Sequence, residues 1–169
     1  RVIADLAGGV AQLQLGRREL AKEHFEHAHA TANEAGDVVA ARGLLGRAFS
    51  ANGVVVRGQQ LGRTIGFPTA NIAVPDGKLL PKGVYAVRLE VGEERLSGMA
   101  NIGTRPTVSG MTESFEVNVF NFDGDLYGLE VTVSFEAFIR SEQKFAGLPA
   151  LIAQLERDRA TAAALLGEG

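Results

Sequence analysis

The pattern of apolar residues divides the chain near residue 48. Before that point, apolar residues recur at helical spacing on both sides of Gly16 and as far as Gly36. This spacing predicts an α-helical hairpin, followed by a third short helix over 37–47 that Asp37 can cap. After Phe49 the pattern changes to short β-type segments separated by Gly and Pro. We therefore predict two parts, a helical hairpin or linker region over 1–48 and a β-domain over 49–169.

The second part contains several segments with the composition of strands. The segment 84–91 alternates between apolar and polar residues after its first positions, and 92–93 has the residues of a tight turn. Asp123-Gly124 predicts a hairpin turn between the last two strands. Five or six short strands without helices between them predict a closed or partly closed antiparallel barrel. The predicted strands are 53–57, 84–91, 95–102, 114–120 and 129–138.

The chain returns to helical spacing near its end. Gln154, Glu156 and Arg157 lie opposite an apolar stripe, which predicts an amphipathic helix packed against the barrel. The stripe consists of Leu148, Leu151, Ile152, Leu155, Ala162 and Leu165.

Composition limits the classes of function. The 169 residues are 46% hydrophobic and 22% charged, which is ordinary globular content. A net charge of −3 without a basic cluster argues against nucleic acid as a partner. No apolar run approaches the roughly 20 residues that span a bilayer, and the absence of cysteine fits a reducing compartment, so we expect no membrane partner and a cytoplasmic location. Because the first residue is Arg, we expect a piece of a longer chain.

The stretch GRTIGFPTAN, residues 62–71, concentrates residues that suit phosphate. Gly58 and Gly62 allow a ligand to approach the main chain closely, and Arg63 offers a planar fork of donors. The stretch matches neither the P-loop nor the dinucleotide fingerprint. A Gly-rich turn with incidental polar residues therefore remains the alternative.

The PTAN tetrapeptide at the end of this stretch favours a functional interpretation. If Thr69-Ala70-Asn71 is extended, the Thr69 hydroxyl and the Asn71 carbonyl project to the same side. Two neutral oxygens on one face suit a hard cation such as magnesium.

Glu116 is the carboxylate of most interest in the β-domain. In the segment FEVNVF it shares a face with Asn118, opposite an apolar face. The pattern alone favours a solvent-facing glutamate, and the functional alternative is a general base that accepts the proton of an attacking hydroxyl. Asn101, Thr104 and Arg105 form a second polar segment, for which a plain turn is the alternative.

All three histidines, His24, His27 and His29, lie in the predicted hairpin. They do not share one helical face, so a solvated helix surface is favoured over a metal site.

Several motifs, in this order and at these spacings, resemble the riboflavin kinase family over about residues 37–166. The resemblance implies a six-stranded antiparallel Greek-key barrel with a C-terminal helix. It also implies transfer of the γ-phosphate of ATP to the 5′-hydroxyl of riboflavin, which yields FMN and ADP. The motifs are GVVVRGQQLGRTIGFPTAN, GVYAV, NIGTRPTV, FEVNVFNFDGDLYG and FIRSEQKF.

The same resemblance implies roles for particular residues. Thr69 and Asn71 would hold Mg²⁺ between the phosphates of ATP, and Glu116 would be the catalytic base. The residues that would contact substrate or nucleotide are Gly58, Gly62 and Arg63 in the phosphate loop, and Asn101, Arg105, Arg140 and Phe145 in flaps around flavin and nucleotide.

Two positions depart from the family pattern. The residue two after the base is usually His and is Asn118 here, and the usual Arg-Pro-Glu is Arg140-Ser141-Glu142. Bacterial members usually join this module to an adenylyltransferase domain. The chain has no HxGH-type motif, so we expect no FAD synthesis from it, and residues 1–36 match neither half of that architecture.

A rival hypothesis is a non-catalytic flavin- or nucleotide-binding barrel whose helical hairpin docks a partner. A third, a repeat-type adaptor, rests only on the loose resemblance of the hairpin to one tetratricopeptide repeat. For the chain itself we expect a monomer.

Overall fold

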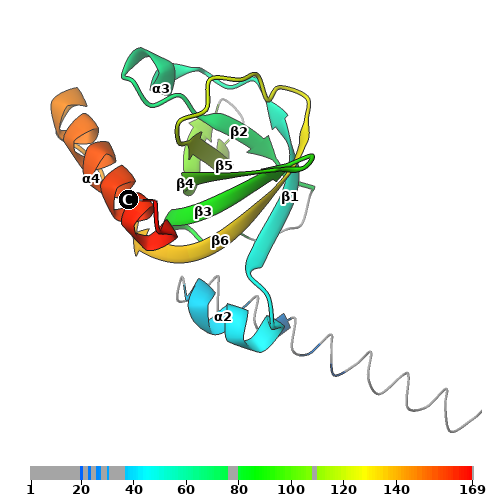
Figure 1. Ribbon diagram of the computed structural model, residues 1–169. Coiled ribbons are helices and arrows are strands. Elements are labelled where there is room, and N and C mark those ends of the chain that lie inside the picture. Colours follow the sequence, from blue (N-terminus) through cyan, green and yellow to red (C-terminus); the bar gives the residue numbers. More distant parts are fainter. Residues whose placement is uncertain are drawn as a thin grey trace, which may run out of the picture.

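The computed structural model describes residues 20, 23, 26, 27, 30, 37–75, 80–107 and 110–168, with only the backbone described at 105–107, 110 and 111. Its centre is a closed antiparallel barrel in which the strands follow the order β1-β2-β5-β4-β3-β6 (Figure 1). This confirms the predicted mainly β fold. The strands are β1 (Phe49–Val56), β2 (Ala70–Ala73), β3 (Gly83–Val91), β4 (Glu94–Thr107), β5 (Gly110–Val119) and β6 (Glu130–Arg140).

The connections make a Greek key. β3, β4 and β5 pair consecutively, and β6 returns to pair with β3 and with β1. The turn at 92–93 is confirmed, with Gly92 at φ 58°. The hairpin predicted at Asp123-Gly124 is wrong, because β5 pairs with β2 and β4 and not with β6. Residues 120–129 instead carry the chain across the barrel end to a different neighbour, which a local turn signal does not reveal.

The barrel interior is packed with aromatic rings around Phe135. The ring of Phe135 lies 5.3 Å from that of Tyr85, 5.7 Å from Phe49 and 5.9 Å from Phe115. Truncation of such a central ring to Ala costs about 3–5 kcal/mol. Tyr85 is fully buried, its hydroxyl donates to the Lys82 carbonyl at 3.2 Å, and burial raises its pKa to about 12. Side chains therefore occupy the middle of the barrel.

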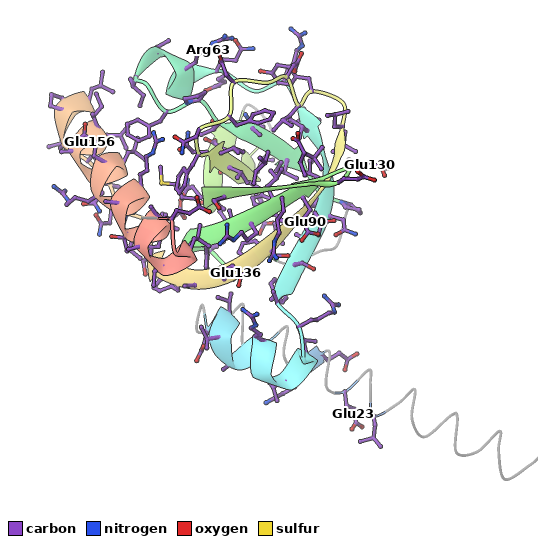
Figure 2. The ribbon with its side chains drawn as sticks, viewed as in Figure 1. Glu23, Arg63, Glu90, Glu130, Glu136 and Glu156 are labelled. Atoms are coloured by element: carbon purple, nitrogen blue, oxygen red, sulfur yellow. The ribbon has the colours of Figure 1, made fainter. Side chains whose placement is uncertain are left out.

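Helix α2 (Val38–Leu45) packs onto the barrel through Val38 and Ala41, which join the barrel core. The predicted cap is confirmed, since Asp37 accepts a hydrogen bond from the Ala40 N–H at 2.8 Å. Glu136 on β6 lies on the side of the barrel nearest α2, where it pairs with Arg42 at 2.7 Å (Figure 2).

The hairpin predicted over residues 1–36 lies outside the described residues, apart from five helical positions. His24 and His29 are not among these, and His27 is exposed. The division of the chain at 48/49 stays a prediction.

Helix α4 (Leu148–Leu166) lies along the outside of the barrel, against β3, β4 and β6 (Figure 1). The predicted packing is confirmed for Ile152, Leu155 and Ala162, which join an outer apolar cluster with Phe67. Leu165 is 52% exposed and its neighbour Leu166 is buried instead. The last turn is therefore rotated by one residue relative to the predicted stripe.

The C-terminal end of α4 is fastened to β3 by Arg88. This arginine donates to the Leu166 carbonyl at 2.6 Å and pairs with Glu168 at 2.7 Å. Hydrogen bonds from Ser97 and Arg88 lower the pKa of Glu168 from its ordinary value of 4.5. Among the described residues, no helix has the length and apolar content needed to cross a membrane.

Candidate functional site

The polar face predicted around Glu116 extends over neighbouring strands on the outer side of the barrel. Glu116 on β5 stands opposite Asn71 on β2 and opposite Asn101 on β4. The row continues through Val84 on β3 to Arg140 on β6. Directly opposed residues share a face and lie within contact range. The barrel register therefore brings together side chains from the PTAN, NIGTRPT, FEVNVF and FIRSEQKF segments.

A second row of residues lies beside this polar row on the outer face, and it is mostly apolar. In this row Asn118 stands opposite Met99, Met99 opposite Ala86, and Ala86 opposite Ala137. Glu116 is half-buried at the border between this apolar row and the polar row. The predicted division of β5 into two faces is confirmed for Phe115 and Val117, which point into the core.

A cavity of about 560 Å³ lies over these two rows. Its walls come from the loop before β2, from α4 and from the segment after β6, and they include Ile65, Phe67, Leu151 and Leu155. The lining also includes polar side chains, namely Thr69 and the residues of the polar row. A largely apolar cavity with a few convergent polar groups is the usual form of a small-molecule site.

The cavity wall is held by a buried ion pair between β6 and α4. Arg140 donates from Nε to Asp158 Oδ1 at 3.0 Å and from Nη2 to Oδ2 at 2.7 Å, and Gln154 donates to the same carboxylate at 2.8 Å. The two charged side chains are 14% and 1% exposed. The Arg140 guanidinium also lies 5.7 Å from the centre of the Phe145 ring. One arginine thus fixes both α4 and the segment after β6.

Two glycines let the loop before β2 pack closely. A Cβ on Gly62 would lie 2.2 Å from the Phe67 carbonyl oxygen, which is much closer than van der Waals contact allows. A Cβ on Gly58 would lie 2.3 Å from Asn71 Nδ2. The same loop contains the short helix α3 (Leu61–Thr64), which includes Gly62 and which the sequence pattern did not predict. Arg63 projects from α3 at the top of the molecule (Figure 2).

A second cavity of about 470 Å³ adjoins the first. Thr69 and Gln60 line both cavities, and Arg63 lines only the second. Its other wall is the connection between β5 and β6, where Tyr127 accepts a hydrogen bond from Gln60 at 3.2 Å. The Arg57 guanidinium lies 5.0 Å from the centre of the Tyr127 ring.

The structure brings most of the predicted site residues together. Gly58 lies against Asn71, Arg63 lines the second cavity, and Arg105 sits in β4 opposite Thr112 with its side chain outside the described part. The remaining predicted residues line the first cavity: Gly62, Thr69, Asn71, Asn101, Glu116, Arg140 and Phe145.

Sequence reasoning missed Asp158 and the wall formed by the β5–β6 connection. Asp158 occupies a position of the apolar face of α4, three residues after Leu155 and four before Ala162. A carboxylate within an apolar stripe signals a buried partner. Residues 122–127 belong to the motif FEVNVFNFDGDLYG, but their residue types indicate only a turn, and their place in a cavity wall follows from the path of the chain.

Comparison with known proteins agrees with this geometry. Residues 45–166 match the Flavokinase family, described as riboflavin kinase. The bifunctional riboflavin kinase/FMN adenylyltransferase of Escherichia coli K12 is 49% identical over 128 residues, which cover 75% of this chain and 41% of the relative. The protein of the same description from Bacillus subtilis is 42% identical over 133 residues, with 76% and 42% covered. The chain therefore spans about two fifths of the length of these relatives.

Two solved structures have the same barrel. Riboflavin kinase from Trypanosoma brucei matches with a TM-score of 0.52 and 26% identity, over 70% of this chain and 80% of that one. A Streptococcus pneumoniae protein described as a macrolide-efflux protein matches with a TM-score of 0.70 and 39% identity, over 78% of this chain and 43% of that one. From the family match and the identity to the bacterial relatives, the chain belongs to the riboflavin kinase family.

Proposed function

We propose that this chain transfers the γ-phosphate of ATP to the 5′-hydroxyl of riboflavin, producing FMN and ADP. The observation that carries the proposal is the position of Glu116, at the border between an apolar cavity and a row of polar side chains beside a second cavity. Family membership supplies the reaction class. The presence of two adjoining cavities supports separate binding sites for the acceptor and for the phosphate donor.

The first cavity suits the flavin. Its apolar floor of Met99 and Ala100 and its wall of Leu151 and Leu155 can cover a flat, apolar ring system. A ring bound there would place a polar side chain, such as the ribityl group, toward the edge that holds Glu116. The acceptor hydroxyl would then reach the carboxylate without crossing the barrel.

The second cavity suits the nucleotide. Arg63 offers paired donors to phosphate oxygens, and the phosphates would end near Thr69, where the two cavities meet. The Thr69 hydroxyl and the Asn71 amide oxygen are neutral, hard ligands that fit Mg²⁺. The close approach of Gly58 to the Asn71 amide leaves no room for a Cβ, so this amide has a defined place. Bound there, Mg²⁺ would neutralise charge on the transferring phosphate.

Within this arrangement the protein positions groups and moves one proton. Glu116 accepts the proton of the riboflavin 5′-hydroxyl as its oxygen attacks the γ-phosphorus, and the bond to the β-phosphate oxygen of ATP breaks. Asn101 stands opposite Glu116 on β4, where its amide can orient the carboxylate or the acceptor hydroxyl. The loop, α4 and the segment after β6 surround the reacting groups and limit the access of water.

The test is a turnover assay with riboflavin, ATP and magnesium, read by chromatography of FMN. Replacement of the base in Glu116→Gln should lower kcat by about 10²–10⁴-fold. Glu130→Gln is the matched control, because Glu130 is exposed on β6 and lies on the side of the barrel away from α4 (Figure 2). Absence of FMN above the Glu116→Gln background contradicts the proposal. Riboflavin binding without ATP consumption would instead select the non-catalytic binding barrel.

A further inference from the structure

Asn118 is a buried polar side chain to which the proposed reaction assigns no role. It is 4% exposed and lines the first cavity beside Met99. Its Nδ2 donates to the Pro68 carbonyl oxygen at 2.7 Å, across 50 positions of the sequence. Its Oδ1 is buried and has no hydrogen-bond partner among the described residues.

The hydrogen bond determines which way the amide faces. The Pro68 carbonyl can only accept, so the amide nitrogen must point toward it and the oxygen must point away. A buried amide oxygen without a partner is unfavourable. The hydrogen bond to Pro68 therefore fixes the orientation of the side chain, although this orientation leaves Oδ1 buried without a partner in the described part of the chain.

Pro68 is the residue that leads into the predicted magnesium ligands. Phe67 before it is buried in the outer apolar cluster, and Thr69 and Asn71 follow it. Proline has no N–H, so its carbonyl is its only backbone hydrogen-bonding group. Residues 67–68 are thus held at two points, by the Phe67 ring and by the Asn118 amide.

We propose that Asn118 is a positioning residue, which sets Thr69 and Asn71 through its hydrogen bond to the Pro68 carbonyl. It acts on the metal-binding segment and does not touch the reacting atoms. Because Asn118 is two residues from Glu116 on the same face of β5, one strand then fixes the distance between the base and the metal ligands. The expected kinetic effect rests on the proposed function. The hydrogen bond between Asn118 and Pro68 does not depend on that function.

Two variants remove the donor in different ways. Asn118→Asp keeps the shape of the side chain but presents only acceptors to the Pro68 carbonyl at neutral pH, and Asn118→Ala leaves space for water. We expect each to raise the KM for MgATP about tenfold, as loss of a residue that orients a metal ligand does. Added magnesium should offset part of the increase, and kcat at saturation should stay within about threefold of wild type.

The control is Ser97→Ala, which removes another buried polar contact on the outer face of β4. Ser97 is 7% exposed and bonds to Arg88 and Glu168 at the C-terminal end of α4, and it lines neither cavity. This variant should lose stability without a change in the KM for MgATP. The proposal would be overturned if the KM for MgATP rose in proportion to the loss of stability in all three variants. A fall in kcat with an unchanged KM in the Asn118 variants would also overturn it.

Amide hydrogen exchange gives a second measurement that needs no substrate. In Asn118→Ala and Asn118→Asp, peptides covering residues 62–71 should exchange faster than in wild type, while peptides covering β3 should not. Unchanged exchange in 62–71 overturns the positioning role even if the kinase assay succeeds. If wild type makes no FMN, the proposed function fails, and faster exchange still supports the contact of Asn118 with the metal-binding segment.

Discussion

At the scale of single residues, the site is built from groups that coordinate and orient. Thr69 and Asn71 supply neutral oxygens, Arg63 supplies a fixed positive charge, and Glu116 supplies a carboxylate at the border of the apolar cavity. Phosphoryl transfer needs positioning and charge neutralisation more than covalent help from the protein. The proposed reaction is therefore compatible with a chain that has no cysteine and whose histidines are confined to residues 24–29.

Different kinetic parameters should report the proposed metal ligand and the proposed base. Thr69→Ala should raise the KM for MgATP by about tenfold and respond to added magnesium. Glu116→Gln should lower kcat with little change in MgATP binding, since the proposed role of the carboxylate is to act on the acceptor hydroxyl. Initial rates over a matrix of ATP and magnesium concentrations separate the two.

The control for the metal ligand is Thr132→Ala on β6, which lines neither cavity and should change neither parameter. Equal effects of Thr69→Ala and Glu116→Gln on both parameters would contradict this division of roles.

The sequence predicted the identity of these residues better than their surroundings. The residue types of the PTAN segment favour a functional role for Thr69 and Asn71, whereas the pattern around Glu116 favours a solvent-facing side chain and only the family resemblance points to it. The tight contact of Gly58 with the Asn71 amide depends on how two segments meet. The same holds for Asn118, whose donor finds a carbonyl 50 positions away. Contacts of this kind follow from register, which a local pattern does not contain.

At the scale of elements, the β-type segments located every strand except β2, although the prediction missed the start of β1, where Phe49 and Ala51 face the core. The segment 84–91 is β3 almost to the residue, because Tyr85, Val87 and Leu89 fill the interior. The short β2 and α3 were not predicted, since four residues are too few to show a period. The incorrect hairpin at 123–124 has a related cause. A turn motif indicates that the chain bends there but not which strand it meets next.

Helix α4 should depend on its buried ion pair for its place against the barrel. Asp158→Asn removes the charge that neutralises Arg140, and loss of one partner of a buried pair should lower the free energy of unfolding by about 3 kcal/mol. Riboflavin should bind more weakly as well, because Leu151 and Leu155 of the same helix form the cavity wall. Urea denaturation and riboflavin fluorescence titration measure the two effects.

The matched control is Glu156→Gln, because Glu156 is exposed on the same helix (Figure 2). This variant should change neither stability nor riboflavin affinity appreciably. If it weakened both as much as Asp158→Asn does, the ion pair would not be what holds α4 in place.

At the scale of the whole molecule, a filled barrel places the chemistry on its outer surface. Aromatic rings around Phe135 pack the middle of the barrel. The first cavity forms where the loop before β2 and α4 cover the outside of the sheet, and the second forms between that loop and the β5–β6 connection. The barrel contributes a rigid register across five strands, and the covering segments contribute the walls. The barrel core and the cavity walls are therefore separate parts of the molecule, apart from the Arg140–Asp158 pair, which joins β6 to α4 and serves both.

The buried Tyr85 hydroxyl makes this separation testable at high pH. Burial raises the pKa of Tyr85 from 10.0 to about 12 in the folded protein. The unfolded chain therefore releases the proton first as pH rises, and unfolding becomes progressively easier between pH 10 and pH 12. By linkage, the neutral hydroxyl contributes stability that is fully present below pH 10 and falls by about 2 kcal/mol by pH 12.

Tyr85→Phe removes this proton, so its free energy of unfolding should fall less than that of wild type over the same range. Tyr127→Phe is the control, because the Tyr127 side chain is 37% exposed on the β5–β6 connection and contributes no buried hydroxyl to the barrel. Urea denaturation at pH 8, 10 and 11.5 measures all three proteins. If the free energy of unfolding fell equally with pH in wild type and in Tyr85→Phe, the barrel core would have to open to solvent before its tyrosine ionises. The interior would then not be the rigid support that the outer site requires.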